Sequence, residues 1–195
     1  MELLEAAVER MLAEDIAVLD GWIPDATLEG LARRLADLED SGALAPAGIG
    51  AGSGSAVHAE VRSDLTQWWE DEPVAAPERA YLDAVRELSA HINRMCFAGI
   101  RSEEIHYASY PQGAFYRRHL DRFRTDSARK ISLITYLNRG WDAERDGGEL
   151  VAYTDAGAVR VAPIWGRTVF FRSDVLEHEV LPARRTRRSV TGWLR

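Results

Sequence analysis

Apolar residues recur at helical spacing through the first half of the chain, three or four positions apart. This spacing predicts an amphipathic helix over residues 2–19, followed by a short strand at Trp22-Ile23. A second helix is predicted to begin with Asp25 as its cap and to stop at Ser41-Gly42. A third is predicted from Pro77 to about Phe97. The first half therefore reads as helical.

After Gly99 the period changes from helical to alternating, as in half-buried strands. The β-rich runs, separated by Gly, Pro, Asn and Asp, are "EIHYASY", "KISLITYLN", "ELVAYT", "AVRVAP", "RTVFFRS", "EHEVLP" and "RRSVTGWL". Short strands at near-regular spacing without helices between them indicate an antiparallel sandwich or barrel. We predict one α+β domain over residues 1–195, with helical support in 1–98 and a β-core in 99–195.

Composition narrows the function classes. The formal charge of −7 argues against general binding to nucleic acid backbones, which needs a basic surface. Cys96 is the single cysteine, which excludes an intramolecular disulfide framework and a zinc site of several thiolates. Acidic residues recur through the first 22 residues, so we expect neither a signal peptide nor a membrane span there. We therefore expect a cytoplasmic protein.

One candidate metal site begins at the tripeptide His119-Leu120-Asp121. In an extended segment the first and third side chains point to the same side, so both could reach one ion. Alone, this motif could equally be a charged surface. His178, in a later β-type run, is the best third ligand, although it could also be an edge-strand histidine. Two histidines and one carboxylate suit non-heme Fe(II), with catalytic zinc as the rival.

An arginine pair on the last predicted strand bears on that choice. By alternation, Arg187 shares a face with Ser189, Thr191 and Trp193, while Arg188 lies on the other face. A guanidinium can bind the far carboxylate of a dicarboxylate co-substrate through two parallel hydrogen bonds. Arg187 is therefore the candidate for that role, and a solvated arginine cluster is the alternative.

Four segments together resemble a known family. They are "YPQGAFYRRHLD", "ITYLNRGWDAERDGGEL", "VFFRSDVLEHEV" and the closing strand with its "TGW". In this order they resemble the iron(II) and 2-oxoglutarate-dependent oxygenases, specifically the prolyl hydroxylase branch typified by the hypoxia-inducible-factor prolyl hydroxylases and their bacterial relatives. The resemblance covers roughly residues 57–195. It implies a double-stranded β-helix (jelly-roll) core with the N-terminal helices packed on it.

The resemblance also implies a role for each residue that matches a family motif. The implied Fe(II) ligands are His119, Asp121 and His178. The implied groups around the C5 carboxylate of 2-oxoglutarate are Arg187, Tyr136 and Thr191. The implied lining of the co-substrate and proline pocket is Tyr110, Leu150 and Trp193.

A loop of about residues 45–70 corresponds to the mobile, substrate-covering finger of this branch. It is rich in glycine and ends in "AEVRSDLTQWW". The resemblance implies that Asp64 pairs with Arg129 to position the loop. One departure is that the run from Tyr110 to His119 is one residue shorter than in the animal enzymes, so the identity of the substrate does not follow.

The implied reaction is hydroxylation of a prolyl residue in a protein, with Fe(II), 2-oxoglutarate and O2, releasing succinate and CO2. We predict ascorbate as a reductant and a translation factor as the protein substrate. We expect neither a nucleic acid nor a membrane partner. Two alternatives stay open: a hydroxylase of a small molecule or free amino acid, and a cupin-like metal-binding module without turnover.

Overall fold

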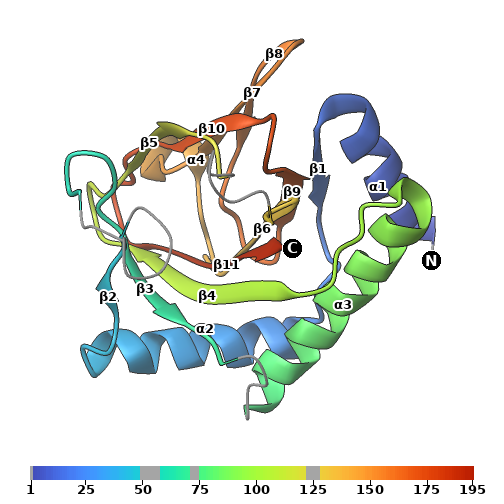
Figure 1. Ribbon diagram of the computed structural model, residues 1–195. Coiled ribbons are helices and arrows are strands. Elements are labelled where there is room, and N and C mark those ends of the chain that lie inside the picture. Colours follow the sequence, from blue (N-terminus) through green and yellow to red (C-terminus); the bar gives the residue numbers. More distant parts are fainter. Residues whose placement is uncertain (1, 49–57, 71–74, 122–127) are drawn as a thin grey trace.

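The computed structural model describes residues 2–48, 58–70, 75–121 and 128–195, and it consists of two antiparallel sheets with helices outside the larger one (Figure 1). The long helices are α1 (Glu2–Glu14), α2 (Asp25–Asp40) and α3 (Ala76–Cys96). A short helix, α4 (Ala143–Asp146), precedes the second half of the strands. None of the helices in the described ranges is long and apolar enough to cross a membrane.

The larger sheet has the strand order β1-β9-β6-β11-β4-β3-β2. Its strands are β1 (Ile16–Leu19), β2 (Ala45–Pro46), β3 (Leu65–Trp68), β4 (Glu103–Tyr110), β6 (Ile131–Tyr136), β9 (Thr168–Arg172) and β11 (Arg187–Leu194). The smaller sheet has the order β5-β10-β7-β8. Its strands are β5 (Tyr116–His119), β7 (Leu150–Thr154), β8 (Gly157–Val161) and β10 (Glu177–Val180). The seven β-rich runs of the sequence are all strands, which confirms the α+β prediction.

The first predicted helix is too long. It ends at Glu14 because Asp15 adopts a left-handed backbone conformation with φ 62°, which breaks the helical path. The residues after it form β1, which pairs antiparallel with β9 from Thr168 to Phe171. Trp22-Ile23 lies outside the strands. The prediction of a strand at Trp22-Ile23 is therefore wrong, and β1 lies instead within the residues that we predicted as the end of the first helix.

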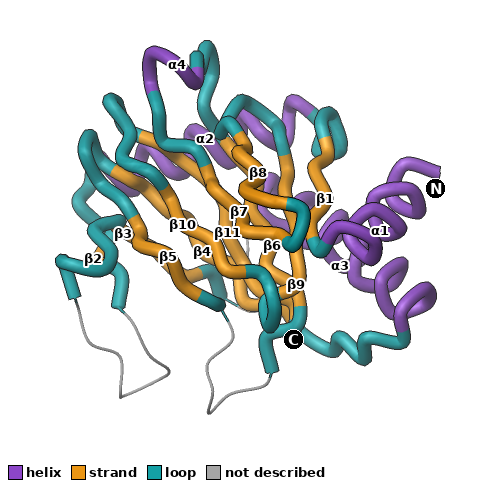
Figure 2. Tube along the Cα trace, turned by 90° about the horizontal axis from the view of Figure 1, so that it is seen from above, coloured by secondary structure: helices purple, strands orange, loops and turns teal. Residues whose placement is uncertain are grey.

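The helices bury the apolar stripes that the sequence predicted. In α2 these residues are Leu28, Leu31, Leu35 and Leu38. They share one core with α1, α3 and the outward face of the larger sheet, including Val190 and Leu194 of β11. Asp25 is the first residue of α2 rather than its cap, because Pro24 holds the cap position without a side-chain hydrogen bond. Figure 2 shows α1 and α3 side by side at one end of the strands.

A second core fills the space between the two sheets. It joins Ala108, Tyr110 and Tyr136 of the larger sheet to Leu150 and Ala152 of the smaller one. Because side chains alternate along a strand, each central strand sends one face to the helices and the other to this inner space. The inner space is where the polar candidates of the sequence converge.

Candidate metal centre

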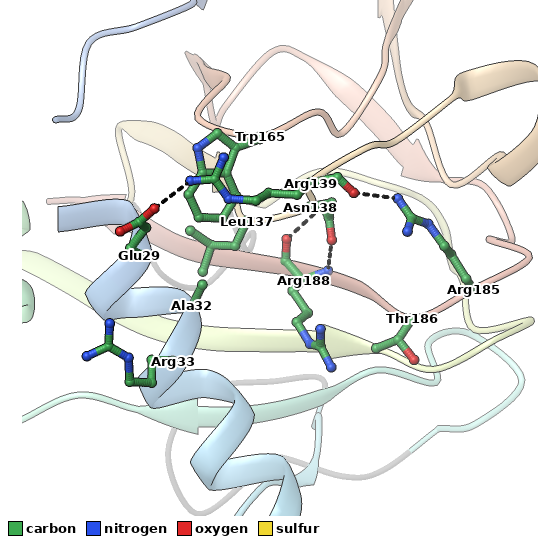
Figure 3. Close-up of a pocket in the computed structure, with 10 residues that line it drawn as sticks. All are labelled: Glu29, Ala32, Arg33, Leu137, Asn138, Arg139, Trp165, Arg185, Thr186 and Arg188. Atoms are coloured by element: carbon green, nitrogen blue, oxygen red, sulfur yellow. Dashed lines mark hydrogen bonds and ion pairs between the residues drawn. The ribbon is translucent and has the colours of Figure 1, made fainter. Parts of the chain in front are cut away.

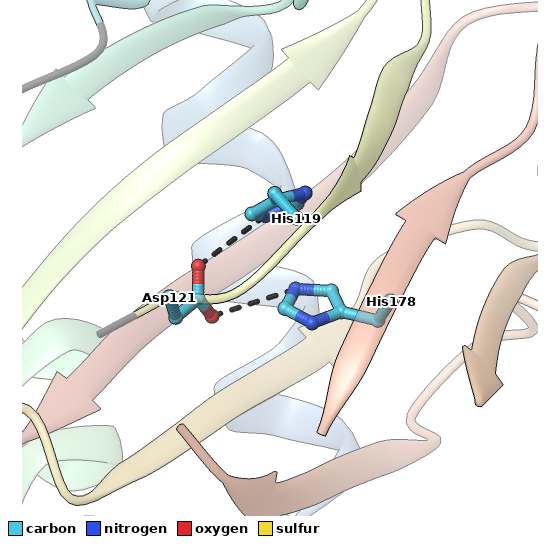
Figure 4. Close-up of side chains that lie close together, drawn as sticks. All are labelled: His119, Asp121 and His178. Atoms are coloured by element: carbon cyan, nitrogen blue, oxygen red, sulfur yellow. Dashed lines mark ion pairs between the residues drawn. The ribbon is translucent and has the colours of Figure 1, made fainter. Parts of the chain in front are cut away.

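His119, Asp121 and His178 meet between the sheets, as Figure 4 shows. His119 ends β5 and lies directly opposite His178 of β10 in the antiparallel register, so both imidazoles point to the same place. Asp121 follows two residues after His119. Its Oδ1 lies 3.4 Å from Nε2 of His119, and its Oδ2 lies 3.5 Å from Nε2 of His178. One ligand atom from each residue falls within 4.8 Å of the others.

Backbone carbonyls fix the orientation of both imidazoles. Nδ1 of His119 lies 2.7 Å from the carbonyl oxygen of Arg117, and Nδ1 of His178 lies 3.1 Å from that of Leu176. A carbonyl only accepts, so each Nδ1 carries the proton and donates. In a neutral imidazole, Nε2 then carries the lone pair, and in both residues Nε2 faces Asp121. This is the tautomer in which histidine binds a metal through Nε2.

The charges of the cluster also suit a cation. Burial alone would raise the pKa of Asp121, but His178, His119 and the Ser132 hydroxyl hold that pKa far below its usual value. Ser132 donates to Oδ2 of Asp121 at 2.6 Å. Burial lowers the pKa of His178 to about 4, against the opposing charge of Asp121. Near neutral pH the cluster is therefore an ionised carboxylate and a neutral His178.

Arg187 is a buried cation in the same inner space. The residue is 1% exposed, and its guanidinium carbon lies 4.9 Å from the ring centroids of both Tyr110 and Tyr136. Within the part of the chain that the structure describes, its Nε and Nη2 have no hydrogen-bond partner, and neither does the buried hydroxyl of Tyr136. Burying a charge without a counterion is costly, so these groups fit an anion that arrives with a ligand.

Arg188 lies on the opposite side of β11, outside the sheets. Figure 3 shows it among the residues that line a pocket between α2 and residues 137–139. The volume of this pocket is about 440 Å³. Its guanidinium pairs with Glu39 of α2 at 2.6 Å, and Arg139 in the same cavity pairs with Glu29 at 2.9 Å. The alternation argument for β11 is therefore confirmed. Of these two arginines, Arg188 has a counterion among the described residues and Arg187 does not.

The remaining pocket candidates also face the inner space. Leu150 is fully buried in the core between the sheets. Thr191 lies opposite His106 in the sheet, and its hydroxyl is 3.2 Å from that of Ser189. Trp193 is buried, its indole nitrogen has no hydrogen-bond partner, and the guanidinium of Arg129 lies 3.5 Å over its ring.

The predicted pair of Asp64 with Arg129 is wrong. Asp64 instead binds Arg62, two residues away, through hydrogen bonds of 2.8 and 2.6 Å. Arg129 pairs with Glu104 at 3.2 Å. Because Arg62 is only two residues away in the same segment, it can donate to both carboxylate oxygens of Asp64. Residues 49–57 of the predicted finger lie outside the described residues.

Sequence reasoning missed His106. It is 2% exposed, stacks on Trp193 with centroids 5.3 Å apart, and lies 4.6 Å from the ring of Trp68. Burial, with the charges of Arg62 and Arg129, lowers its pKa to about 3, so its imidazole is neutral. The signal was available, because His106 lies four residues before Tyr110 on β4 and must face the same side.

Two comparisons with known proteins identify the family of this chain. The family described as the 2OG-Fe(II) oxygenase superfamily matches residues 105–195, which include the metal cluster and Arg187. A crystal structure of a Pseudomonas putida prolyl-4-hydroxylase is 37% identical, with a TM-score of 0.88, and 98% of each chain is covered. The chain belongs to the 2OG-Fe(II) oxygenase superfamily. As a member it is a dioxygenase enzyme that uses Fe(II), 2-oxoglutarate and O2.

Other relatives of the oxygenase are more distant. The rat Egl nine homolog 1 is 29% identical over 97% of this chain and 58% of its own length. The oxygenase therefore spans about half the length of the curated relatives it matches. A Trichoplax adhaerens prolyl hydroxylase, solved with a hypoxia-inducible-factor peptide, is 23% identical with a TM-score of 0.90 over 99% of this chain and 89% of that one. These likenesses confirm the jelly-roll fold.

The donor set of the oxygenase fits iron. Two imidazole nitrogens and one carboxylate oxygen on one side would leave other positions of an octahedron for a co-substrate and O2. The Nε2 of His119 is buried without a hydrogen-bond partner, as expected of an atom reserved for a metal. The buried guanidinium of Arg187 lies in the same space between the sheets, against Tyr110 and Tyr136.

Proposed function

We propose that the oxygenase hydroxylates a prolyl residue of a protein substrate. His119, Asp121 and His178 would hold Fe(II), and Arg187 would hold the far carboxylate of 2-oxoglutarate. The single observation that carries this assignment is the buried, unpartnered guanidinium of Arg187 in the same inner space as a two-histidine, one-carboxylate cluster. A metal site alone would not need that cation.

The side chains around the site have separate tasks. The Arg187 guanidinium neutralises the C5 carboxylate, and the Tyr136 hydroxyl and Thr191 add hydrogen bonds to it. Tyr110 and Leu150 form walls that keep water away from the reacting atoms. When bound, Fe(II) and 2-oxoglutarate supply the oxidising chemistry: O2 and 2-oxoglutarate are consumed, a C–H bond becomes C–OH, and succinate and CO2 are released.

The choice of proline rests on two kinds of support. The Pseudomonas relative is a prolyl-4-hydroxylase, and the Trichoplax relative was solved with a peptide. The rings of Trp68, His106 and Trp193 form a continuous aromatic wall, a surface on which a pyrrolidine ring can pack. A translation factor as substrate, ascorbate as reductant and a cytoplasmic location stay predictions.

The test uses the purified oxygenase and protein extract from host cells that lack its gene. We expect Fe(II) and 2-oxoglutarate to yield succinate together with one added oxygen on a proline of a host protein, seen by mass spectrometry. A His119→Ala variant should yield neither product. Succinate without any modified proline would refute the prolyl proposal, and hydroxylated free proline or another small molecule would favour the alternative substrate class.

A further inference from the structure

The two histidines of the metal cluster are held very differently. His178 lies in β10, which pairs with a strand on each side, and its ring packs edge-on against Phe171 at 4.5 Å. His119 ends β5, a four-residue strand at the edge of the smaller sheet. Within that sheet, β5 pairs with β10 at two register positions. Apart from the hydrogen bond of its Nδ1 to the carbonyl of Arg117, the His119 ring therefore receives less support from the sheet than the ring of His178 does.

A β-bulge supplies the first part of that support. In the register of β5 with β10, His119 lies opposite His178, but Tyr116 rather than Arg117 lies opposite Val180. The extra residue turns Tyr116 to the same face as His119, although residues three apart normally point to opposite faces. The two rings stack with centroids 3.5 Å apart and an angle of 13° between their planes.

Arg62 supplies the second part. Its guanidinium carbon lies 4.3 Å from the centroid of the Tyr116 ring. The guanidinium donates two hydrogen bonds to the carboxylate of Asp64, and Arg62 and Asp64 are 9% and 1% exposed. A buried, bidentate ion pair of this kind is rigid, because moving either side chain would leave the other charge buried without a counterion.

The backbone of residues 61–63 is also joined to β5. The amide of Arg117 donates to the carbonyl of Val61 at 2.9 Å, and the amide of Ser63 donates to the carbonyl of Phe115 at 3.1 Å. Arg62 and Tyr116 form an isolated antiparallel bridge. The segment 58–64 thus completes the side of β5 that the smaller sheet leaves open.

We propose that Arg62 is a positioning residue for the metal site, acting through Tyr116 on the ring of His119. This inference rests on the proposed role of His119 as a ligand. Removing partners that orient a ligand typically lowers metal affinity about 10- to 100-fold. Because coupling is reciprocal, metal binding should in turn stabilise the 58–64 segment by the same factor.

The experiment measures Mn(II) affinity from the electron paramagnetic resonance signal of free Mn(II). Replacing Arg62 alone would leave Asp64 buried and unpaired, so the test variant is Arg62→Met with Asp64→Asn. A second variant, Tyr116→Leu, removes the stack but keeps the ion pair, and Tyr116→Phe restores the ring. Both disrupting variants should bind Mn(II) at least 10-fold more weakly than the unaltered protein, and Tyr116→Phe should bind within twofold of it.

The chain offers a matched control on the outer side of the same strand. Arg118 lies 3.8 Å over the ring of Tyr153 and pairs with Glu177. The variant Arg118→Met with Glu177→Gln therefore removes the same kinds of contact without touching the stack on His119. It should bind Mn(II) within twofold of the unaltered protein. An equal loss in this control, or no loss in the Arg62 variant, would overturn the inference.

Hydrogen exchange provides a readout of the coupling itself. Mn(II) should slow exchange of the amides in residues 58–64 of the unaltered protein and should have no such effect in Tyr116→Leu. Protection that persists in that variant would contradict the coupling. If the unaltered protein binds no Mn(II), the metal site itself fails, and that result is distinct from failure of the role of Arg62.

Discussion

Replacing Arg187 with methionine should make the metal-free protein more stable and almost unable to bind 2-oxoglutarate. The guanidinium is buried between Tyr110 and Tyr136, and two of its nitrogens have no partner. Methionine is of similar length and carries no charge. The variant therefore removes a cost that the protein bears until an anion binds.

The two effects can be estimated from the contacts. Two hydrogen bonds between charged groups contribute about 1.5–3 kcal/mol each, so their loss weakens binding by about 3–6 kcal/mol, or roughly 10²- to 10⁴-fold. Replacing buried charges with apolar groups of similar volume stabilises proteins by about 1–4 kcal/mol. For a chain of this length each kcal/mol raises the melting midpoint by about 2–4 °C.

The assay is calorimetric titration of 2-oxoglutarate in the presence of Mn(II), together with thermal unfolding of the metal-free protein. Arg188→Met is the control, since it removes a partly exposed ion pair with Glu39 on the other face of β11. The control should keep its 2-oxoglutarate affinity and should not gain stability. Loss of stability in Arg187→Met, or 2-oxoglutarate affinity within twofold of the unaltered protein, would refute the reasoning.

Three further variants test individual groups. Tyr136→Phe should weaken 2-oxoglutarate binding about 10- to 100-fold without lowering the melting midpoint, since the hydroxyl has no partner before the ligand binds; unchanged affinity would argue against its role. In the folded protein the pKa of His106 is lowered to about 3, so as the pH falls this histidine is protonated in the unfolded chain before it is protonated in the folded one. Protonation therefore favours unfolding, and His106 should lower the free energy of unfolding of the metal-free protein by about 2 kcal/mol between pH 7 and pH 5. Urea unfolding at both pH values should show that His106→Phe removes this part of the pH dependence. If the variant keeps the full pH dependence, the effect does not come from His106. Gly192→Ala should cost about 1–3 kcal/mol in urea unfolding, because its Cβ would lie 2.5 Å from the carbonyl oxygen of Glu104; an unchanged midpoint would show that β4 can shift.

Periodicity was sufficient for most of the fold. The leucine spacing of α2 and the alternation of β11 each follow from burial on one face, so the pattern in the sequence reports the structure directly. Four strands gave no such signal, and two of them, β2 and β3, lie in the segment that we predicted as a loop of about residues 45–70. β1 continues the apolar pattern of α1, and only the left-handed backbone at Asp15 separates them. β5 reads "YRRH", which is short and polar because it lies at an edge.

Those site residues could be predicted whose role follows from residue type and strand alternation alone. His119, Asp121 and His178 come together as expected, and Arg187 faces inward while Arg188 faces outward. Contacts that depend on a bulge or on competition between partners could not be read from spacing. The stack of Tyr116 on His119 needs the extra residue in β5, and Asp64 takes Arg62 because it is nearer than Arg129.

The central claim is that the three-residue cluster and Arg187 bind Fe(II) and 2-oxoglutarate together. Anaerobic addition of both to the purified oxygenase tests it most directly, through the visible metal-to-ligand charge-transfer absorption of the complex. We expect the band in the unaltered protein, its absence in His119→Ala and Asp121→Ala, and a higher 2-oxoglutarate requirement in Arg187→Met. A band that survives His119→Ala, or none in the unaltered protein, would contradict the account.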